Sequence, residues 1–395
     1  FDMRKLTIPD SSIRKHRECV GERLQNYLDR LALHGAISWN VGGARIGTEE
    51  RAKREKERDD LILALRSIHC REFFSRVARR FRDDDISVAR PDVLMDFATD
   101  CLRWESSLER REPGARNNCR KVLSILFNFS AFVQGRKLVD AGVDGCILWT
   151  KRRDASYEWS AWHFIDSLGV RYCPYCNAET VGNMAYLASD GTRRLHQSDL
   201  DHFFPKSEYP LLSLSLYNLV PSCCRCNSRF KGSRNHLAER VKRGSLGVLH
   251  PYLDNFSDHF RFEYAPNSLN ELYVKKNQKD GPLHVYPIGK HVKLAARYLR
   301  EYHIAEVYRD FYDSELMAAI KSAALYTPSV REVLEAKYPG ISEEELDVSL
   351  FRASSDEARF NRHRFAKAIC DIRSCFLAPD SKFDLKVVEN CLFDG

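Results

Sequence analysis

Apolar side chains recur at intervals of three and four positions through most of the first 165 residues. This spacing places the apolar residues on one face of an α-helix. Pro91 predicts a helix start, because proline is favoured in the first helical turn, and the Pro113-Gly114 pair predicts a break. We therefore predict a helical N-terminal region, with helices over 13–33, 61–81, 94–102 and 122–132.

The pattern changes near residue 170, where short strands and turns replace the helical periodicity. Two short β-type stretches flank Asp190-Gly191, a dipeptide typical of a tight hairpin turn. Alternation of apolar and polar residues predicts two further strands, at 260–264 and 272–274. Helical spacing then returns over 294–312, 316–326 and 357–376.

These patterns divide the chain into three predicted regions. A helical N-terminal region spans 1–169, a central core of short strands and turns spans 170–247, and a C-terminal region of short strands followed by helices spans 248–395. The predicted fold class is mainly α with a small α+β insert between helical flanks.

Composition agrees with a soluble globular protein, since 44% of the 395 residues are hydrophobic and 30% are charged. No apolar run approaches the roughly 20 residues of a membrane span, so no membrane partner is expected. The first residues lack the apolar stretch of a signal peptide. Because the 13 cysteines are an odd number in a chain without such a signal, we expect free thiols rather than a disulfide framework, and a cytoplasmic location.

Four of the cysteines form two C-x-x-C pairs, Cys173/Cys176 and Cys223/Cys226. Two such pairs around a compact polar segment predict a tetrahedral zinc site with four thiolate ligands. Because four sulfur ligands close the coordination sphere, this zinc is predicted to be structural. Cys224 is the spare cysteine, and the two-residue spacer favours Cys223 as the ligand. A redox C-x-x-C is the alternative, which the second pair disfavours.

The segment between the two pairs contains Asp201-His202. Hydrolysis of a phosphodiester needs a hard divalent cation with oxygen ligands and a neutral imidazole that takes a proton from water. Asp201 and the amide oxygen of Asn227 are suitable metal ligands, and His202 is a suitable base. Adjacent residues of a strand point to opposite faces, so Asp201 and His202 reach one phosphate only if the strand bends or the phosphate lies across its end.

These residues resemble the motif of the HNH endonuclease family, whose core is the ββα-metal fold. The matching pieces occur in the family's order: Cys173-x-x-Cys176, Asp201-His202-x-x-Pro205, Asn218-Leu219 and Cys223-x-x-Cys226-Asn227-x-x-x-Lys231-Gly232. The resemblance implies that His202 is the general base and that Asp201 and Asn227 bind a catalytic Mg²⁺ or Mn²⁺. It implies that Asn218 is an orienting residue that fixes the loop or the His202 ring. Lys231 follows Asn227 at a longer spacing than the family's usual one.

A finer resemblance covers 201–210, 214–221 and His250-Pro251-Tyr252. These segments are similar to the HNH nuclease subunit of Septu-type and retron-associated anti-phage systems. That similarity implies a role in defence and a partner subunit that is an ABC-type ATPase. The chain has no G-x-x-x-x-G-K-[ST] phosphate loop, so we do not expect it to hydrolyse ATP itself.

The net charge of +7 is concentrated around the predicted site. The segment from Arg193 to Arg243 contains ten basic and four acidic residues, an excess of positive charge that a phosphate-binding groove requires.

DNA is the expected substrate, cut with low sequence specificity. A ribonuclease that acts on tRNA, and a non-catalytic zinc protein that binds nucleic acid or acts as an adaptor, are the alternatives. The predicted nucleic-acid contacts are Lys206, Arg225, Arg229 and Lys231.

Other polar and aromatic residues near these motifs have simpler interpretations. His196 and His236 flank the site and are predicted to be surface histidines. The helical spacing of the C-terminal tyrosines predicts core packing rather than base stacking, and these tyrosines are Tyr298, Tyr302, Tyr308 and Tyr312.

Overall fold

The computed structural model describes most of the chain as two compact units that interleave along the sequence. One unit, here called the helical unit, comprises 8–168 and 200–220, and the other, here called the knuckle unit, comprises 1–7, 169–199 and 221–395. The described residues are 6–35, 37–40, 47–139, 146–147, 149, 159–191, 193–236, 248–264, 283–311, 316–326, 328–351, 353 and 357–377. They are mostly helical, with four two-stranded sheets, which confirms a mainly α fold with small β elements.

The division into units differs in detail from the three predicted regions. The predicted boundary at 169/170 lies one residue from the division after Leu168. Residues 200–220, however, which the sequence assigns to the central core, belong to the helical unit. The core motif is therefore divided between the two units.

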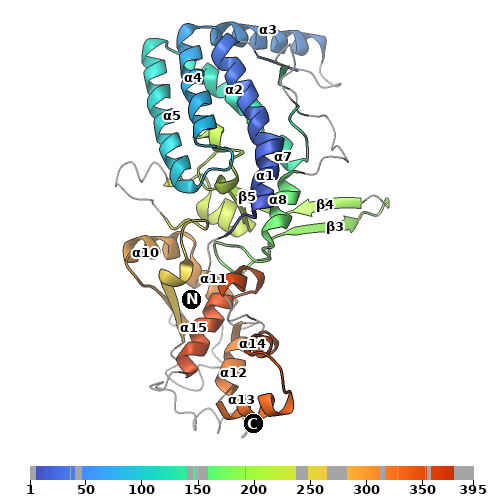
Figure 1. Ribbon diagram of the computed structural model, residues 1–395, viewed down its shortest axis with the longest axis vertical. Coiled ribbons are helices and arrows are strands. Elements are labelled where there is room, and N and C mark those ends of the chain that lie inside the picture. The colour runs from blue at the N-terminus through green and yellow to red at the C-terminus, as the bar shows by residue number, and fades with distance from the viewer. Residues whose placement is uncertain are drawn as a thin grey trace. The chain divides into compact units, whose positions relative to one another are not determined.

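Helices build the first part of the helical unit, and α2, α4 and α5 are drawn in blue to cyan in Figure 1. The elements are α1 (Asp10–His16), a π-helical turn (Arg17–Gly21), α2 (Glu22–His34), α3 (Thr48–Leu65), α4 (Ile68–Asp83), α5 (Pro91–Arg111), α6 (Ala115–Leu126), α7 (Phe129–Val133) and α8 (Ala161–Leu168). Strands β1 (Ser38–Trp39) and β2 (Cys146–Ile147) form a short parallel pair.

An apolar stripe on each helix explains this packing. α2 buries Tyr27 and Leu28, and α4, which packs against it, buries Phe73, Phe74 and Val77. Burial of such side chains contributes about 1.5–3 kcal/mol each to stability. The apolar periodicity therefore predicted the helices that form this core.

Local signals set the helix ends. The predicted helix 61–81 is two helices, because the Ser67 side chain caps α4 by accepting a hydrogen bond from the Cys70 backbone N–H at 3.1 Å. α5 begins at Pro91, as predicted. Gly114 has a φ of 86° and precedes α6, which confirms the predicted break.

The segment 200–220 carries most of β5 (Asp199–His202), the short 3₁₀ helices η2 (Pro210–Leu212) and η3 (Leu216–Asn218), and the start of β6 (Leu219–Ser222). β5 and β6 pair as a two-stranded sheet. The backbone N–H of Leu216 donates to the Ser87 carbonyl at 2.9 Å. The Ser213 hydroxyl donates to the Phe127 carbonyl at 2.9 Å. These bonds attach the segment to the helices of its unit.

His16, at the end of α1, also holds this segment. Its Nε2 donates to the Leu214 carbonyl at 2.7 Å, and its Nδ1 accepts from the Trp159 indole N–H at 2.9 Å. The ring is fully buried. Both nitrogens are therefore satisfied only when the imidazole is neutral.

The knuckle unit combines two antiparallel hairpins with the C-terminal helices. β3 (Asn183–Leu187) pairs with β4 (Arg193–Gln197), which confirms the hairpin predicted around Asp190-Gly191. β7 (Phe260–Tyr264) pairs with β8 (Leu283–Pro287). The remaining elements are η4 (Arg225–Lys231), η5 (Phe256–Asp258), α10 (Val292–Glu301), α11 (Ile304–Asp310), α12 (Met317–Leu325), α13 (Pro328–Lys337), α14 (Glu343–Phe351), η8 (Glu357–Arg362) and α15 (Ala366–Leu377).

An aromatic cluster forms the core of the knuckle unit. Tyr298, Tyr302 and Tyr308 are buried, which confirms that they pack in the core. The Tyr298 ring lies 4.7 Å from that of Tyr302, and the Phe262 ring of β7 lies 4.5 Å from that of Tyr308. Tyr312 and the predicted strand 272–274 lie outside the described residues. Within the described part of the chain, no helix is both long and apolar enough to cross a membrane.

Buried histidines give the protein a predicted pH dependence of stability. Burial lowers the pKa of His16, His236 and His250 to about 3 each, whereas an unfolded histidine titrates near ~6.5. Below about pH 6.5 these histidines therefore bind protons in the unfolded chain but not in the folded chain. Their contribution to the free energy of unfolding is complete above that pH and decreases as the pH falls. We expect the thermal unfolding midpoint to be lower at pH 5.5 than at pH 7.5.

The exposed His196 provides the matched control. H196Q should keep the same decrease, because that side chain is not buried. A midpoint that stays constant between pH 7.5 and 5.5 would contradict the prediction.

Candidate active site and metal centre

The two cysteine pairs come together in the knuckle unit. The sulfur atoms of Cys173, Cys176, Cys223 and Cys226 all lie within 4.8 Å of one another, and all four side chains are buried. Cys224 is exposed and outside the group, as its sequence position predicts. Among the described residues, this is the group of His, Cys, Asp and Glu side chains that has the geometry of a metal site.

The cysteine group fits a zinc ion in size and donor type. Four sulfurs at ~2.3 Å from one zinc lie about 3.8 Å apart in a tetrahedron, which agrees with the observed cluster. Backbone N–H groups support the sulfurs, since Cys223 N donates to the Cys173 Sγ and Cys226 N to the Cys223 Sγ, both at 3.4 Å. Such donors stabilise thiolates.

Residues from the C-terminal part of the chain hold the first cysteine pair. Asn177 adopts a left-handed φ of 52° directly after Cys176. Its side-chain amide donates to the carbonyls of Phe360 at 2.9 Å and His363 at 3.2 Å. The Tyr298 hydroxyl donates to the Tyr175 carbonyl, inside the C-x-x-C turn. The knuckle is therefore fixed by α10 and the segment before α15.

His202 lies in the helical unit at the end of β5, with 8% of its surface exposed. Its Nε2 is 3.0 Å from the Ser213 carbonyl oxygen. Because a carbonyl only accepts, Nε2 carries the hydrogen, and in the neutral ring the lone pair lies on Nδ1. The Phe129 ring packs edge-on against the imidazole, with centroids 4.3 Å apart. These contacts fix both the tautomer and the ring plane.

Asn218 fixes the loop that follows His202. Its Oδ1 accepts from the Phe204 N–H at 2.7 Å, and its Nδ2 donates to the carbonyls of Phe204 at 3.1 Å and Leu212 at 2.9 Å. The side chain is completely buried. Asn218 thus makes three hydrogen bonds, of which an aspartate could reproduce only the one from Phe204 N and an alanine none.

Three consecutive carbonyl oxygens therefore accept hydrogen bonds from buried side chains. Leu212 accepts from Asn218, Ser213 from His202, and Leu214 from His16. We call these three residues the carbonyl triplet.

Sequence reasoning missed the parts of this arrangement that lie far along the chain. Neither Phe129, which packs on His202, nor His16 carries a local motif. The Ser213 carbonyl belongs to the backbone, which carries no residue-specific signal. Only the fold brings Phe129 and the Ser213 carbonyl to His202, and His16 to the neighbouring Leu214 carbonyl.

The predicted ligands of the catalytic metal belong to different units, so each is described separately. Asp201 is 2% exposed and lies in the helical unit. Asn227 lies on η4 in the knuckle unit, where its Nδ2 donates to the Asp199 carboxylate at 3.2 Å. The amide nitrogen is therefore engaged, and Oδ1 is the ligand atom that Asn227 can offer a cation. Mg²⁺ commonly takes one or two protein oxygens and fills its other positions with water and phosphate.

The four predicted nucleic-acid contacts have different environments. Lys206 is exposed, and its Nζ lies 5.0 Å from the centroid of the Phe129 ring, beside His202. Arg229 is also exposed. Arg225 is engaged by Glu179 at 3.2 Å and Asp310 at 3.6 Å, and Lys231 is only 4% exposed. Lys206 and Arg229 therefore present their charges to solvent more fully than Arg225 and Lys231.

One of the two flanking histidines was predicted incorrectly. His196 is exposed, as expected, but His236 is buried, with its Nδ1 3.8 Å from Glu301. Burial, reinforced by the positive charges of Lys231 and Arg297, lowers the pKa of His236 to about 3. His236 is therefore a neutral core residue.

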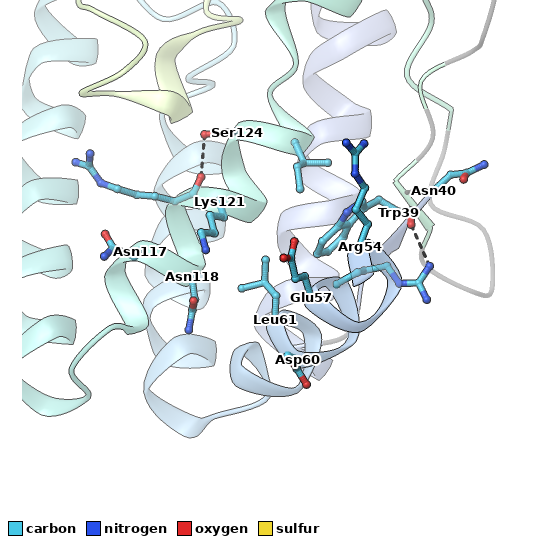
Figure 2. A pocket seen from close by; sticks show the side chains of 13 residues that line it. Trp39, Asn40, Arg54, Glu57, Asp60, Leu61, Asn117, Asn118, Lys121 and Ser124 are labelled. Carbon is cyan, nitrogen blue, oxygen red and sulfur yellow. Dashed lines mark hydrogen bonds between the residues drawn. The ribbon is translucent and has the colours of Figure 1, made fainter. Parts of the chain in front are cut away.

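A separate open cavity of about 1320 Å³ lies between α3 and α6 of the helical unit. Figure 2 shows Asn118 and Lys121 of α6 on one side and Glu57 and Leu61 of α3 on the other. The cavity contains none of the predicted catalytic or zinc residues. Its mixed charges do not point to one class of ligand.

Comparison with known proteins gives one partial match. A stretch of 94 residues is 30% identical to Septu protein PtuB of Bacillus thuringiensis. The match covers 24% of this chain and 29% of the relative, so the chain spans less than a third of that protein's length. No protein-family model matches the chain, and no solved structure matches it. Similarity to a Septu protein is thus found for a quarter of the chain, and membership of the HNH family stays a prediction.

The Asn218 hydrogen bonds lead to a prediction about stability. In N218D, one carboxylate oxygen still accepts from Phe204 N, but the other faces the Phe204 and Leu212 carbonyls without a proton to donate. We expect the free energy of unfolding to fall by about 3 kcal/mol, measured by urea denaturation. N117D, at an exposed position on α6, is the matched control and should change stability by less than about 0.5 kcal/mol. Equal effects of the two substitutions on the free energy of unfolding would argue against this role of the Asn218 hydrogen bonds.

Proposed function

We propose that the chain is a metal-dependent endonuclease of the HNH type, which hydrolyses phosphodiester bonds of DNA with low sequence specificity. The observation that carries this proposal is the hydrogen bond from His202 Nε2 to the Ser213 carbonyl. It holds the imidazole in the tautomer that a general base requires, with the lone pair on Nδ1. The element order β5, β6, η4, with a cysteine pair before β5 and another at η4, agrees with the ββα motif.

In the proposed reaction, His202 Nδ1 takes the proton of the attacking water, and the Ser213 carbonyl stabilises the imidazolium that forms. Asp201 and Asn227 would hold a Mg²⁺ or Mn²⁺ ion, which when bound supplies positive charge to the scissile phosphate and the leaving oxygen. Asn218 keeps the backbone after His202 in place. Lys206, next to the His202–Phe129 contact, and Arg229 would contact phosphates.

The four-cysteine cluster would hold a structural zinc ion. All four donors are protein sulfurs and all are buried, so they leave no open coordination position for a substrate. Four thiolates buried together are costly without a cation that compensates their charge. Zinc would therefore stabilise the knuckle unit rather than take part in the reaction.

The similarity to a Septu protein supports a role in anti-phage defence. The sequence resemblance adds an ABC-type ATPase subunit as the proposed regulatory partner, and the cytoplasm as the proposed location. A low-specificity nuclease would damage the DNA of its own cell, so control by a partner is a reasonable expectation. RNA remains the alternative substrate, because the same chemistry acts on both backbones.

Removal of the proposed base tests the enzymatic function. Loss of a general base typically slows a reaction by about 10²–10⁴-fold, so H202A should cleave at least about 100-fold more slowly than the unmodified protein. The assay follows cleavage of supercoiled plasmid, single-stranded DNA and tRNA side by side, with Mg²⁺ and with EDTA, in the presence and absence of the co-expressed ATPase.

H196Q serves as the matched control, because His196 is exposed and is not assigned a role. It should retain full activity. Cleavage by H202A at the unmodified rate would exclude His202 as the base. Cleavage of tRNA alone would indicate the ribonuclease. Metal-independent binding without any cleavage would indicate the non-catalytic adaptor.

Substitution of the cysteines tests the zinc site. C173S and C226S should each lose the bound zinc, measured by mass spectrometry of metals in the purified protein, and should unfold at a lower temperature. C224S, at the exposed neighbouring cysteine, should keep one zinc per chain and an unchanged midpoint. Equal zinc content in C224S and C173S would contradict the assigned ligand set.

A further inference from the structure

Several arginines of the helical unit are held by carboxylates. Arg80 pairs with Asp84 and Asp100, and Arg82 pairs with Asp29. Three arginines of α4 are different: within the described part of the chain, they form no ion pair and no side-chain hydrogen bond. These are Arg71, Arg76 and Arg79.

The three arginines line one open groove of about 560 Å³ along α4, here called the α4 groove. Arg71, Ser75 and Arg79 succeed one another at four-residue steps, so they lie on one face of the helix with about 6 Å of rise between neighbours. Ala32 and Ile68 complete the apolar part of the lining. The position of α4 in the helical unit is labelled in Figure 1.

The α4 groove has a net positive charge. Its one acidic residue is Glu72, whose carboxylate is engaged by Arg111 at 2.7 Å. The Arg76 charge also acts on Glu72 and helps to lower its pKa, so three arginines share the groove with one carboxylate and its lining keeps a positive excess.

The Arg71 Nε is the second sign of a missing ligand. It is buried and has no hydrogen-bond acceptor within the described part of the chain. A buried donor without an acceptor costs free energy, and no acceptor among the described residues competes with a ligand for the Arg71 Nε. A guanidinium group binds phosphate oxygens through two parallel N–H donors, and the other two arginines extend this capacity along the helix.

We propose that the α4 groove binds the sugar–phosphate backbone of the nucleic acid that the enzyme cleaves. This inference rests on the proposed nuclease function and gives the N-terminal helices a part in it. A row of like charges on one helix matches a polyanion of regularly repeated charge better than an acidic side chain at a single position. Contacts to phosphates carry no sequence information, in agreement with the low specificity proposed above.

The test compares two triple variants in the cleavage-deficient H202A background, so that the probe stays intact. R71Q/R76Q/R79Q removes the three groove charges. K53Q/K56Q/R110Q removes three exposed positive charges elsewhere on the helical unit and is the matched control. Fluorescence anisotropy with a 30-base-pair DNA duplex and with a single-stranded DNA of equal length gives the affinity at several salt concentrations.

We expect R71Q/R76Q/R79Q to weaken binding at least about tenfold at 0.1 M salt. The slope of log K against log salt should become shallower by about 2–3, since each neutralised phosphate contributes ~0.9 for duplex DNA. The control should change affinity less than about twofold. R71K/R76K/R79K, which keeps the charge, should retain most of the binding, and circular dichroism establishes that each variant is folded.

Equal effects of the two glutamine triples, or an unchanged affinity, would overturn the proposal. So would normal DNA binding by R71Q/R76Q/R79Q together with lost retention on immobilised poly-L-glutamate, because the groove would then take an acidic protein segment. If the groove variant loses DNA binding while the unmodified protein cleaves no substrate, the groove assignment stands and the nuclease function is wrong.

Discussion

The carbonyl triplet is the constraint on which the candidate site depends. Leu212, Ser213 and Leu214 direct three successive carbonyl oxygens at Asn218, His202 and His16. One bond sets the tautomer of His202, another fixes the backbone after it, and the third joins the segment to α1 through a ring that also accepts from Trp159. Because these groups are buried, loss of one partner would leave a carbonyl without a donor and would disturb the other two bonds.

The cysteine cluster is supported separately, by the C-terminal part of the chain. Asn177 donates to the carbonyls of Phe360 and His363, and Tyr298 donates to the Tyr175 carbonyl. The two ends of the chain therefore have different tasks. The N-terminal part of the chain holds the His202 segment, and the C-terminal part holds the first cysteine pair.

Local sequence signals predicted the local structure well. Apolar spacing predicted the helices, Asp190-Gly191 predicted the hairpin, and the two C-x-x-C pairs predicted which cysteines gather while Cys224 stays exposed. What the sequence did not reveal depends on long-range packing. His236 is buried against Glu301, and the segment 200–220 belongs to the helical unit. Both placements result from contacts with side chains and backbone groups that are distant in the sequence. Such contacts leave no periodic pattern along the chain.

The distribution of charge shows the same difference between sequence and fold. Counted along the sequence, the positive excess lies between Arg193 and Arg243, but within the described part of that stretch Arg225 is paired with Glu179 and Asp310, and Lys231 is buried. The same count gives only a small positive excess around α4, because acidic residues flank its arginines along the chain. In the fold, Glu72 binds Arg111 of α5 and Asp85 binds Arg17. The positive charge available to a polyanion is therefore set by which ion pairs the fold forms, and the α4 groove adds to it even though the sequence around it is nearly balanced.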